Sequence, residues 1–423
     1  MGVRALDAGG RGGLRGLLRG LRRHHRAFRA GSETRFWTMK APVRSRAAII
    51  GISGYGRIHL GLAREAADRL ALAAAVVINP QEEAANVRAL EADGCRIYGN
   101  YEEMLRAEAG RIDLCLIPTG IAWHTRMTVA ALRAGMNVLV EKPLAASVAE
   151  VHEVQAAAAA AQRFVAVGFQ DIYAPEAQRV KHKLLDGAIG PIRSVRLLGL
   201  WPRPASYFSR NSWAGRLRAD GALVLDSPLN NAFAHFVNLG LFFAGREFAV
   251  SAQTRNVDAV LWRTNSIESF DTGVVRAETT DGVALWFGVT HASPVVREPE
   301  IVIEGENGQI VWRHERECVI VTQAGATECI PLPETSVTRT EMMRAVLRRL
   351  EDAQAFVCTP EIALRQTELV ERVHAVAEIT PAPGGVESRP RQGGGEPMFC
   401  SPGLEEILQR AFHDRSLPAA VRA

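Results

Sequence analysis

Short apolar runs alternate with helical stretches between Ala47 and Gly168, and this alternation constrains the fold more than any other feature of the sequence. Strands separated by helices over such a span indicate repeated βαβ units and therefore a parallel sheet. The expected strands are residues 47–50, 73–78, 96–98, 112–117, 137–140 and 164–168. The expected helices are residues 57–70, 81–92, 102–109, 124–134 and 148–162.

The pattern changes after about Gln170, where longer segments of alternating polar and apolar residues dominate. Turn sequences such as Asp281-Gly282 and Asn307-Gly308 separate some of them and are typical of hairpins. The sequence therefore predicts an open, mostly antiparallel sheet here. Its expected strands are residues 192–200, 248–257, 274–280, 283–290, 300–304, 309–313 and 318–322, with helices at 176–185, 339–351 and 360–379.

Residues 381–423 begin with a segment rich in proline and glycine and end with a short amphipathic helix at 403–412. The first part has the composition of a linker. Two alternatives remain open for the helix: it docks on the body of the protein, or it belongs to a disordered appendage.

The 423-residue chain carries a formal net charge of +4, which the first 38 residues account for. They contain nine arginines against Asp7 and Glu33, so the remainder carries −3. Because the body offers no excess of basic residues, we expect no nucleic-acid partner. We expect residues 1–43 to form an Arg/Gly-rich disordered tail, unless translation begins at Met39 and leaves the upstream stretch out of the protein.

Membrane and metal partners are not expected either. No apolar run approaches the length of a membrane-spanning helix. The six cysteines form no CxxC pair, so nothing indicates a zinc site or a disulfide framework. Free thiols of this kind are typical of a reducing, cytoplasmic location.

The loop after the first strand reads Gly51-Ile52-Ser53-Gly54-Tyr55-Gly56 and matches the pattern G-x-G-x-x-G, except that Ser53 replaces the second glycine. This pattern gives a tight turn in which the backbone approaches a pyrophosphate at the N-terminus of a helix. The loop lies between a clear strand and a clear helix, which is the context that the pattern requires. We therefore predict that it binds a dinucleotide.

The choice between NAD and NADP stays open. The acidic residue that usually holds the adenine ribose at the end of the second strand is replaced by Asn79. Asn79 can bond the ribose hydroxyls and repels a 2′-phosphate less than an aspartate does. Arg57 is the nearest candidate cation for such a phosphate, or else a solvated residue of the first helical turn.

Lys142 follows the fifth expected strand directly, in Val140-Glu141-Lys142-Pro143. Ligands of parallel sheets bind beyond the carboxyl ends of the strands, so Lys142 is expected to face the nicotinamide part of the crevice. An ammonium at that place can move the proton of a reacting hydroxyl or polarise a carbonyl. The alternative is a solvated lysine at a strand end.

Several segments together resemble the Gfo/Idh/MocA oxidoreductases, the family of glucose–fructose oxidoreductase and inositol dehydrogenase. The resemblance covers roughly residues 46–380. Its segments are Gly51–Gly56, Ile117-Pro118-Thr119 followed by His124, Ala134–Leu144 with Glu141-Lys142-Pro143, Val167–Gln170, and Gly187–Ile192.

The resemblance implies an α/β protein with an N-terminal Rossmann domain, a second α/β domain with an open antiparallel sheet, bound NAD or NADP, and homo-oligomers assembled through that sheet. We place the Rossmann domain at 44–169, the substrate domain at 170–380, and a linker with a short helix at 381–423. The resemblance makes Lys142 the catalytic lysine. The expected cofactor-binding residues are Gly51, Ser53, Gly54, Tyr55, Gly56, Arg57, Asn79, Pro118, Thr119, His124, Glu141 and Lys142.

In the second domain the family carries an aspartate with a histidine four residues later, a pair that can shuttle the substrate proton. Here Asp226 is followed at that spacing by Asn230, and His235 comes nine residues after Asp226. In one register a short insertion separates Asp226 from a functional His235. In the other, Asn230 replaces the histidine and Lys142 is the only acid/base. We favour the first and expect Lys142, His235 and Asp226 to be catalytic.

A polar-aromatic connection upstream supplies the expected sugar contacts, because flat rings suit C–H faces and Arg or Asn side chains suit hydroxyls. The expected substrate-binding residues are Tyr173, Arg210, Asn211, Trp213, Asn230 and Asn231. Ile172 occupies a position where the family often has an arginine, which argues against an anionic substrate.

The leading hypothesis is a cytoplasmic NAD(P)-dependent oxidoreductase that acts on a sugar, polyol or cyclitol hydroxyl. A second hypothesis is an NAD-dependent glycosidase that oxidises its substrate transiently. A third is a non-catalytic nucleotide- or sugar-sensing regulator, suggested by Ser53, Asn79 and Asn230, which depart from the family pattern.

Overall fold

A computed structural model describes residues 44–390 and 396–419. The expected tail at 1–43 lies outside the described residues. Within them, no helix is long and apolar enough to cross a membrane.

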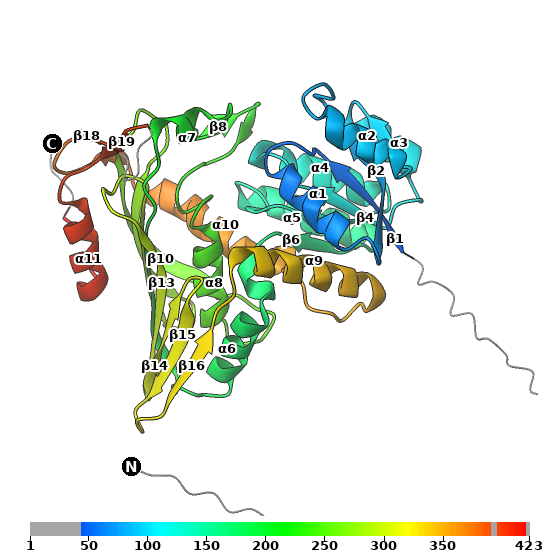
Figure 1. Ribbon diagram of the computed structural model, residues 1–423. Helices are drawn as coiled ribbons and strands as arrows, with labels where there is room; N and C mark the ends of the chain where they lie inside the picture. Colours follow the sequence, from blue (N-terminus) through cyan, green and yellow to red (C-terminus); the bar gives the residue numbers. More distant parts are fainter. Residues whose placement is uncertain (1–43, 391–395, 420–423) are drawn as a thin grey trace, which may run out of the picture. The chain divides into compact units, whose positions relative to one another are not determined.

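The first half of the described chain forms a six-stranded parallel sheet with strand order β3-β2-β1-β4-β5-β6 (Figure 1). Its strands are β1 (Ser45–Ile50), β2 (Leu70–Val76), β3 (Arg96–Tyr98), β4 (Leu114–Ile117), β5 (Asn137–Val140) and β6 (Val165–Val167). The connecting helices are α1 (Gly56–Glu65), α2 (Ala84–Ala92), α3 (Tyr101–Glu108), α4 (Ile121–Arg133) and α5 (Val148–Ala161). The predicted βαβ units are therefore confirmed.

Local sequence explains several of these boundaries. Every residue of β4 is buried, as expected for a central strand covered on both faces. Helix α5 begins with a capping box, in which Ser147 and Glu150 satisfy each other's backbone N–H groups. Strand β2 starts earlier than predicted, because α1 ends at Glu65 and Leu70, expected in the helix, is a buried first strand residue.

The second half is built on a nine-stranded sheet with strand order β16-β15-β14-β13-β7-β12-β11-β10-β17. The expected open, mostly antiparallel sheet is confirmed, with parallel pairing at β7–β12 and β10–β17. Its strands are β7 (Ile192–Leu200), β10 (Thr254–Arg263), β11 (Thr272–Thr279), β12 (Ala284–Thr290), β13 (Arg297–Gly305), β14 (Gly308–Arg313), β15 (Glu317–Thr322), β16 (Thr327–Pro331) and β17 (Ile379–Pro381).

Strand β10 begins later than the predicted 248–257. The strand contains a bulge between Arg255 and Asp258, where Asn256 takes a left-handed φ of 51°. A bulge shifts the side-chain alternation by one residue, so the polar–apolar pattern cannot be read continuously through it.

Helices cover one face of the large sheet. Helix α8 contacts β7, and α10 contacts β10 and α8. The short η1 contacts α8 and α9. The elements around this face are η1 (Gln170–Tyr173), α6 (Pro175–Leu185), α7 (Ala205–Ser209), β8 (Arg218–Ala219), β9 (Ala222–Leu223), α8 (Ala234–Ala244), α9 (Thr335–Glu351) and α10 (Pro360–Val376).

The C-terminal segment is more ordered than a linker. It contributes β17 to the large sheet, and β18 (Glu387–Arg389) pairs with β19 (Met398–Cys400). Helix α11 (Leu404–Asp414) docks on β7 and β12, on the face of the sheet away from α8 and α10 (Figure 1). The docked alternative for this helix is therefore the one that the structure adopts.

The contact under α11 is apolar and specific. Leu404 and Leu408 are fully buried among Leu198, Trp262 and Trp286. The indole N–H of Trp286 donates a hydrogen bond of 2.9 Å to the carbonyl of Ser416 just beyond the helix. The outer face of the sheet is thus covered by the chain's own C-terminus at this place.

Candidate active site

The glycine loop between β1 and α1 has the geometry that its sequence demands. Gly51 and Gly54 take left-handed φ values of 89° and 56°, which favour glycine. A Cβ at Gly56 would lie 2.4 Å from the carbonyl oxygen of Gly51, closer than real Cβ atoms approach. Around Gly54, by contrast, nothing lies within 4 Å of such an atom. The loop is closed on its inner side and open where a ligand would approach.

Replacing Gly56 by alanine is expected to lower both the stability of the protein, by about 1–3 kcal/mol, and its affinity for nucleotide, because the turn must open to admit the methyl group. Gly61→Ala is the matched control in the same helix, since a Cβ there meets nothing within 4 Å. It should keep nucleotide affinity and raise helix stability slightly. Thermal unfolding and NADH fluorescence measure the two effects, and an unchanged Gly56→Ala variant would contradict the assignment.

Ser53 and Asn79 meet at the open side of the loop. The Ser53 hydroxyl donates to Oδ1 of Asn79 over 3.1 Å, and Nδ2 of Asn79 donates to Glu82 over 2.7 Å. The second strand lacks the usual acidic residue at its end, but the exposed carboxylate of Glu82 lies next to Asn79 at that place.

Arg57, the candidate cation for a 2′-phosphate, is already paired. Its guanidinium lies 2.7 Å from Oε1 of Glu83, and Asn86 donates to the other oxygen of the same carboxylate. The hydrogen bonds from Arg57 and Asn86 lower the pKa of Glu83, so the carboxylate stays ionised beside the arginine. The Arg57 side chain is 62% exposed, so it is a solvated first-turn arginine that also pairs with Glu83.

Glu141 links the glycine loop's helix to the end of β5. Its Oε1 lies 2.8 Å from Nε2 of His59 on α1, and Oε2 accepts a hydrogen bond of 3.2 Å from the backbone N–H of Lys142. Burial raises the pKa of Glu141, but the bond and charge of His59 and the charge of Lys142 outweigh it and leave the pKa below its ordinary value. An ionised Glu141 therefore positions the residue that follows it.

Lys142 extends from the carboxyl end of β5 toward the turn that precedes α8. Its Nζ donates to the backbone oxygen of Asn231 over 3.0 Å and to Oδ1 of the same residue over 3.1 Å. Burial lowers the pKa of Lys142, while Glu141 and Asp226 oppose that shift. A lysine held in this way can exchange a proton closer to neutral pH than a solvated one.

Asp226 reaches Lys142 through Asn231. Its Oδ1 accepts from Nδ2 of Asn231 over 2.8 Å, and its Oδ2 accepts from the N–H of Gly215 over 2.6 Å. Burial raises the pKa of Asp226, and these two hydrogen bonds oppose the shift. Asn231 thus lies between the carboxylate and the ammonium and bonds both.

Asp226 and His235 have different partners in the structure. Residues 226–233 form a series of turns, and α8 starts only at Ala234, so the two side chains do not share a helix face. Nδ1 of His235 lies instead 3.3 Å from Oδ2 of Asp171 in η1. Burial lowers the pKa of His235, and Asp171 opposes this shift.

Asn230 occupies the sequence position of the family histidine, four residues after Asp226, but its side chain is buried away from the site. It is 1% exposed, donates from Nδ2 to the carbonyl of Val224 over 3.0 Å and accepts from Gln366 over 3.1 Å. A side chain committed to these buried partners does not contact substrate, so the expectation that Asn230 binds substrate is wrong. Asn231, the next residue, is the one that faces Lys142.

Pro118, Thr119 and His124 lie against the glycine loop and the end of β5. Cβ atoms at Gly51 and Gly56 would lie 3.8 Å from Thr119 and 3.7 Å from Pro118. The two ring nitrogens of His124 lie 2.7 Å from the Pro143 carbonyl and 2.9 Å from the Thr119 carbonyl. Burial lowers the pKa of His124, and its role is to hold the two loops together.

Tyr173 is wrongly expected to face substrate. It is 1% exposed, its hydroxyl donates to the carbonyl of Val167 over 3.0 Å, and it accepts from the N–H of Cys358 over 3.0 Å. This hydroxyl joins the end of β6 to the segment before α10, a structural task.

Arg210, Asn211 and Trp213 belong to one loop of the second half, and this loop contacts the first half of the protein at Gly120, just before α4. Oδ1 of Asn211 accepts from the N–H groups of Trp213 and Ala214, so this side chain shapes the loop. The Trp213 indole packs against the start of α4, because a Cβ on Gly120 would lie only 3.0 Å from its Nε1. Arg210 lies over the ring of Tyr207, 3.7 Å from its centroid.

The sequence analysis missed four residues of the site. His59 and Asp171 are the buried partners of Glu141 and His235. Arg339 on α9 lies 5.5 Å from the ring centroid of Tyr55, the exposed residue of the glycine loop. Tyr207 is the fourth. Only the polarity of His59 within an apolar helix face could have signalled any of them.

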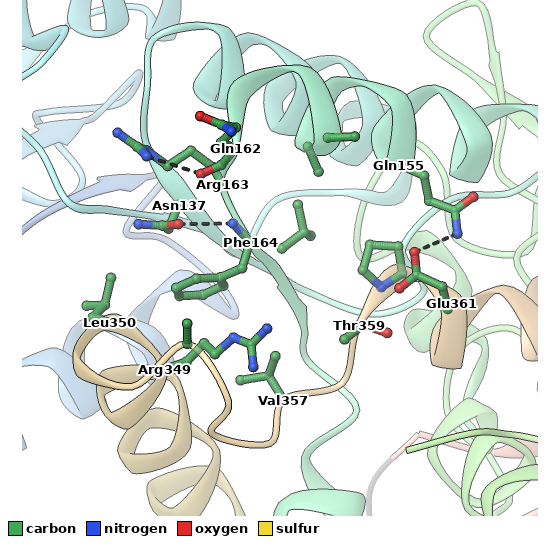
Figure 2. Close-up of a pocket in the computed structure, with 15 residues that line it drawn as sticks. Asn137, Gln155, Gln162, Arg163, Phe164, Arg349, Leu350, Val357, Thr359 and Glu361 are labelled. Atoms are coloured by element: carbon green, nitrogen blue, oxygen red, sulfur yellow. Dashed lines mark hydrogen bonds between the residues drawn. The ribbon is translucent and has the colours of Figure 1, made fainter. Parts of the chain in front are cut away.

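A groove of about 650 Å³ lies elsewhere (Figure 2). It is lined at the start of β5 and β6 by Asn137 and Phe164, and by Arg349 and Glu361 from α9 and α10. Its polar groups bond one another or nearby backbone, as Gln155 does with Glu361 over 2.9 Å. The groove contains none of the expected site residues. In the described chain, no three His, Cys, Asp or Glu side chains are grouped as metal ligands, and all six cysteines are free thiols.

A Rossmann-type sheet with a glycine loop, joined to a second α/β layer at a half-buried lysine, defines the class of nicotinamide-dependent oxidoreductases. The model of the oxidoreductase family with an NAD-binding Rossmann fold, GFO_IDH_MocA, matches residues 45–169, and the GFO/IDH/MocA C-terminal domain matches residues 177–311. Together they match more than half of the chain. The protein belongs to the Gfo/Idh/MocA oxidoreductase family, as the resemblance implied.

Among its relatives, dTDP-3,4-didehydro-2,6-dideoxy-alpha-D-glucose 3-reductase of Streptomyces antibioticus is 27% identical over 317 residues, which cover 72% of this chain and 89% of the reductase. Inositol 2-dehydrogenase 4 of Saccharopolyspora erythraea is 31% identical over 143 residues, covering 33% of this chain and 42% of that protein.

Solved structures share the fold. The WlbA dehydrogenase from Bordetella pertussis in complex with NADH and UDP-GlcNAcA superposes with a TM-score of 0.64 at 22% identity, over 79% of this chain and 96% of that one. Levoglucosan dehydrogenase in complex with NADH and levoglucosan has a TM-score of 0.66 at 18% identity, over the same shares. At these identities the likeness concerns the fold alone, and it supports the predicted fold class.

Proposed function

We propose that the protein is an NAD-dependent dehydrogenase or reductase of a sugar, polyol or cyclitol, with Lys142 as the group that handles the hydroxyl proton. The observation that carries this proposal is the placement of Lys142. It lies at the carboxyl end of β5, with its Nζ on Asn231 and its backbone on Glu141. The reductase and dehydrogenases among its relatives and structural neighbours act on compounds of this class by their names.

The residues divide the work as follows. The glycine loop, with Pro118 and Thr119 behind it, would hold the pyrophosphate and the nicotinamide side of the cofactor. The bound nicotinamide accepts or supplies the hydride. Lys142 takes the proton from the substrate hydroxyl or returns it, and Asn231 orients its Nζ. Asp226 acts through Asn231, and His235 with Asp171 supplies a second polar pair on the side of η1.

We propose further that NAD is preferred to NADP. Glu82 brings a carboxylate to Asn79, where the adenine ribose would lie, and Arg57 is occupied by Glu83. A 2′-phosphate would meet the carboxylates of Glu82 and Glu83 there, with Arg57 already paired to Glu83. We expect kcat/KM to be about tenfold or more higher with NAD than with NADP. Glu82→Gln should reduce this preference for NAD. A wild-type preference for NADP would contradict this assignment.

The lowered pKa of Lys142 predicts a pH profile. As an amine base, neutral Lys142 accepts the hydroxyl proton during oxidation, so kcat/KM for oxidation should rise with pH, and reduction, which needs the ammonium, should fall. The inflection should lie below 10.5, the ordinary lysine value, because burial favours the neutral amine. Arg210 also lowers this pKa, so Arg210→Gln should move the inflection upward. A flat profile between neutral and alkaline pH would exclude Lys142 as the base.

The domain division at 169 and 380, the cytoplasmic location and a homo-oligomer are proposals that follow from family membership. Because α11 covers β7 and β12, an assembly through the large sheet would have to use its outer strands β13–β16. Sedimentation of the full chain measures its oligomeric state. If substitutions in α11 abolished a dimer, the contact between subunits would lie at the face that α11 covers.

The function is tested by identifying any nicotinamide that co-purifies with the protein, then measuring NADH formation over a panel of sugars, polyols and cyclitols. Net NADH formation with one class supports a dehydrogenase. Release of an aglycone without NADH would indicate the transient oxidation of a glycosidase. Nucleotide binding with no turnover of any member would indicate a sensor and contradict the proposal.

A further inference from the structure

Two arginines of the second half flank a single aromatic ring beside the catalytic group. The guanidinium of Arg210 lies 3.7 Å from the ring centroid of Tyr207, and that of Arg203 lies 5.0 Å from the same centroid. Arg210 is exposed and also lies 5.3 Å from the centroid of Trp213. The two positive charges are therefore held on one side of the crevice by stacking.

Neither arginine is neutralised within the described residues. No carboxylate lies at ion-pair distance from Arg203 or Arg210 there, although most other arginines near an acid do form such pairs. The Nε atom of Arg203 is buried and has no hydrogen-bond partner. Arg210 donates only to the backbone carbonyl of Tyr207 in its own loop. A buried guanidinium nitrogen without an acceptor is costly, so an acceptor bound there would stabilise it.

Tyr207, against which both arginines lie, lines a small cavity beside the reacting group. Arg210 is close enough to influence the pKa values of both Asp226 and Lys142. Tyr207, Asp226 and Asn231 line one small cavity together with His291. Burial, together with the charges of Arg203 and Arg210, lowers the pKa of His291 to about 3, so this imidazole stays neutral and adds no positive charge of its own.

The local charge is therefore positive. The positive charges of Lys142, Arg203 and Arg210 outnumber the carboxylates of Glu141 and Asp226. Glu141 is bonded by His59 and the backbone of Lys142, and both Asp226 oxygens are bonded by Asn231 and Gly215. Arginine forks match carboxylate and phosphate oxygens, with which they form two parallel hydrogen bonds. A neutral polyol would leave these donors unmatched.

We propose that the substrate carries an anionic group, a carboxylate or a phosphate ester, that binds Arg203 and Arg210 while its reacting hydroxyl meets Lys142. This inference rests on the proposed function. It reverses the expectation drawn from Ile172, because the arginines come from the connection after β7 and not from the position before Tyr173.

The test measures binding of three matched probes, D-glucose, D-glucuronate and D-glucose 6-phosphate, to the full chain with NADH bound, by fluorescence of tryptophan and NADH. Glucuronate or glucose 6-phosphate should bind at least about tenfold more tightly than glucose, and added salt should weaken only the acidic probes. The two acidic probes distinguish a carboxylate site from a phosphate site.

Arg210→Gln and Arg203→Gln should each remove this preference, and Arg203→Lys should restore only part of it, since lysine lacks the fork. Arg218→Gln, an exposed arginine of the same connection, is the matched control and should keep it. Retained NADH binding shows that each variant is folded.

Equal binding of glucose and the acidic probes, no response to either acidic probe, or equal losses in Arg210→Gln and Arg218→Gln would overturn the proposal. Failure of the wild-type chain to bind NADH would instead overturn the proposed function. The two failures are therefore distinguishable.

Discussion

Lys142→Met is expected to lower turnover by about 10²–10⁴-fold while NADH still binds, because the methionine fills similar space but cannot move a proton. The Nζ that it removes is the one held by Asn231, at the carboxyl end of β5. Steady-state rates and NADH fluorescence give the two readouts.

Lys183→Met is the matched control. Lys183 lies on α6 in a partly exposed ion pair with Glu328, an interaction that contributes little. Its turnover should equal that of the wild type. A Lys142→Met variant with wild-type turnover would remove the lysine from the chemistry, and loss of NADH binding in that variant would make its role structural.

Leu408→Asp in α11 is the second variant with a large expected effect. Leu408 is fully buried against the outer face of the large sheet, so a carboxylate there loses the apolar contact and lacks a partner. We expect α11 to detach, exposing Trp286 and Leu198, and the protein to self-associate through that face. Light scattering and binding of an apolar dye measure this.

The control for α11 is Gln409→Asp, which adds the same charge at the exposed neighbouring position. Gln409→Asp should scatter light and bind the apolar dye to the same extent as the wild-type protein. If Leu408→Asp neither scatters more light nor binds more dye than Gln409→Asp, the covering role of α11 is wrong.

Local features made the first half of the protein readable from its sequence. The glycine loop and Lys142 are fixed by neighbours in the chain: Gly51 and Gly56 by the turn between β1 and α1, and Lys142 by the end of β5. Short-range patterns of this kind carry their own geometry.

The side-chain partners of the site residues could not be predicted from the sequence, because they come from segments that are distant along the chain. His235 meets Asp171 from η1, and Lys142 meets Asn231, 89 residues away. The family spacing places the aspartate and the residue four positions later on one helix face. Here residues 226–233 form turns, which delays α8 to Ala234 and leaves Asn231 facing Lys142. Tyr173 was misplaced because its burial depends on Cys358.

The C-terminal segment shows the same limit. Its proline and glycine content is typical of a linker, yet Ile379–Pro381 adds to the large sheet and α11 docks on it. The amphipathic spacing of Leu404 and Leu408 predicted a helix, but its docking surface on β7 and β12 lies more than a hundred residues earlier.

The central claim is that the crevice at Lys142 transfers a hydride between a substrate carbon and a nicotinamide. The most direct measurement supplies panel substrates deuterated at their hydroxyl-bearing carbons, together with NAD, and follows the label by mass spectrometry. The account predicts that deuterium appears on the nicotinamide ring with the wild-type protein and not with Lys142→Met. Bound nicotinamide that stays unlabelled with every substrate of the panel would contradict it.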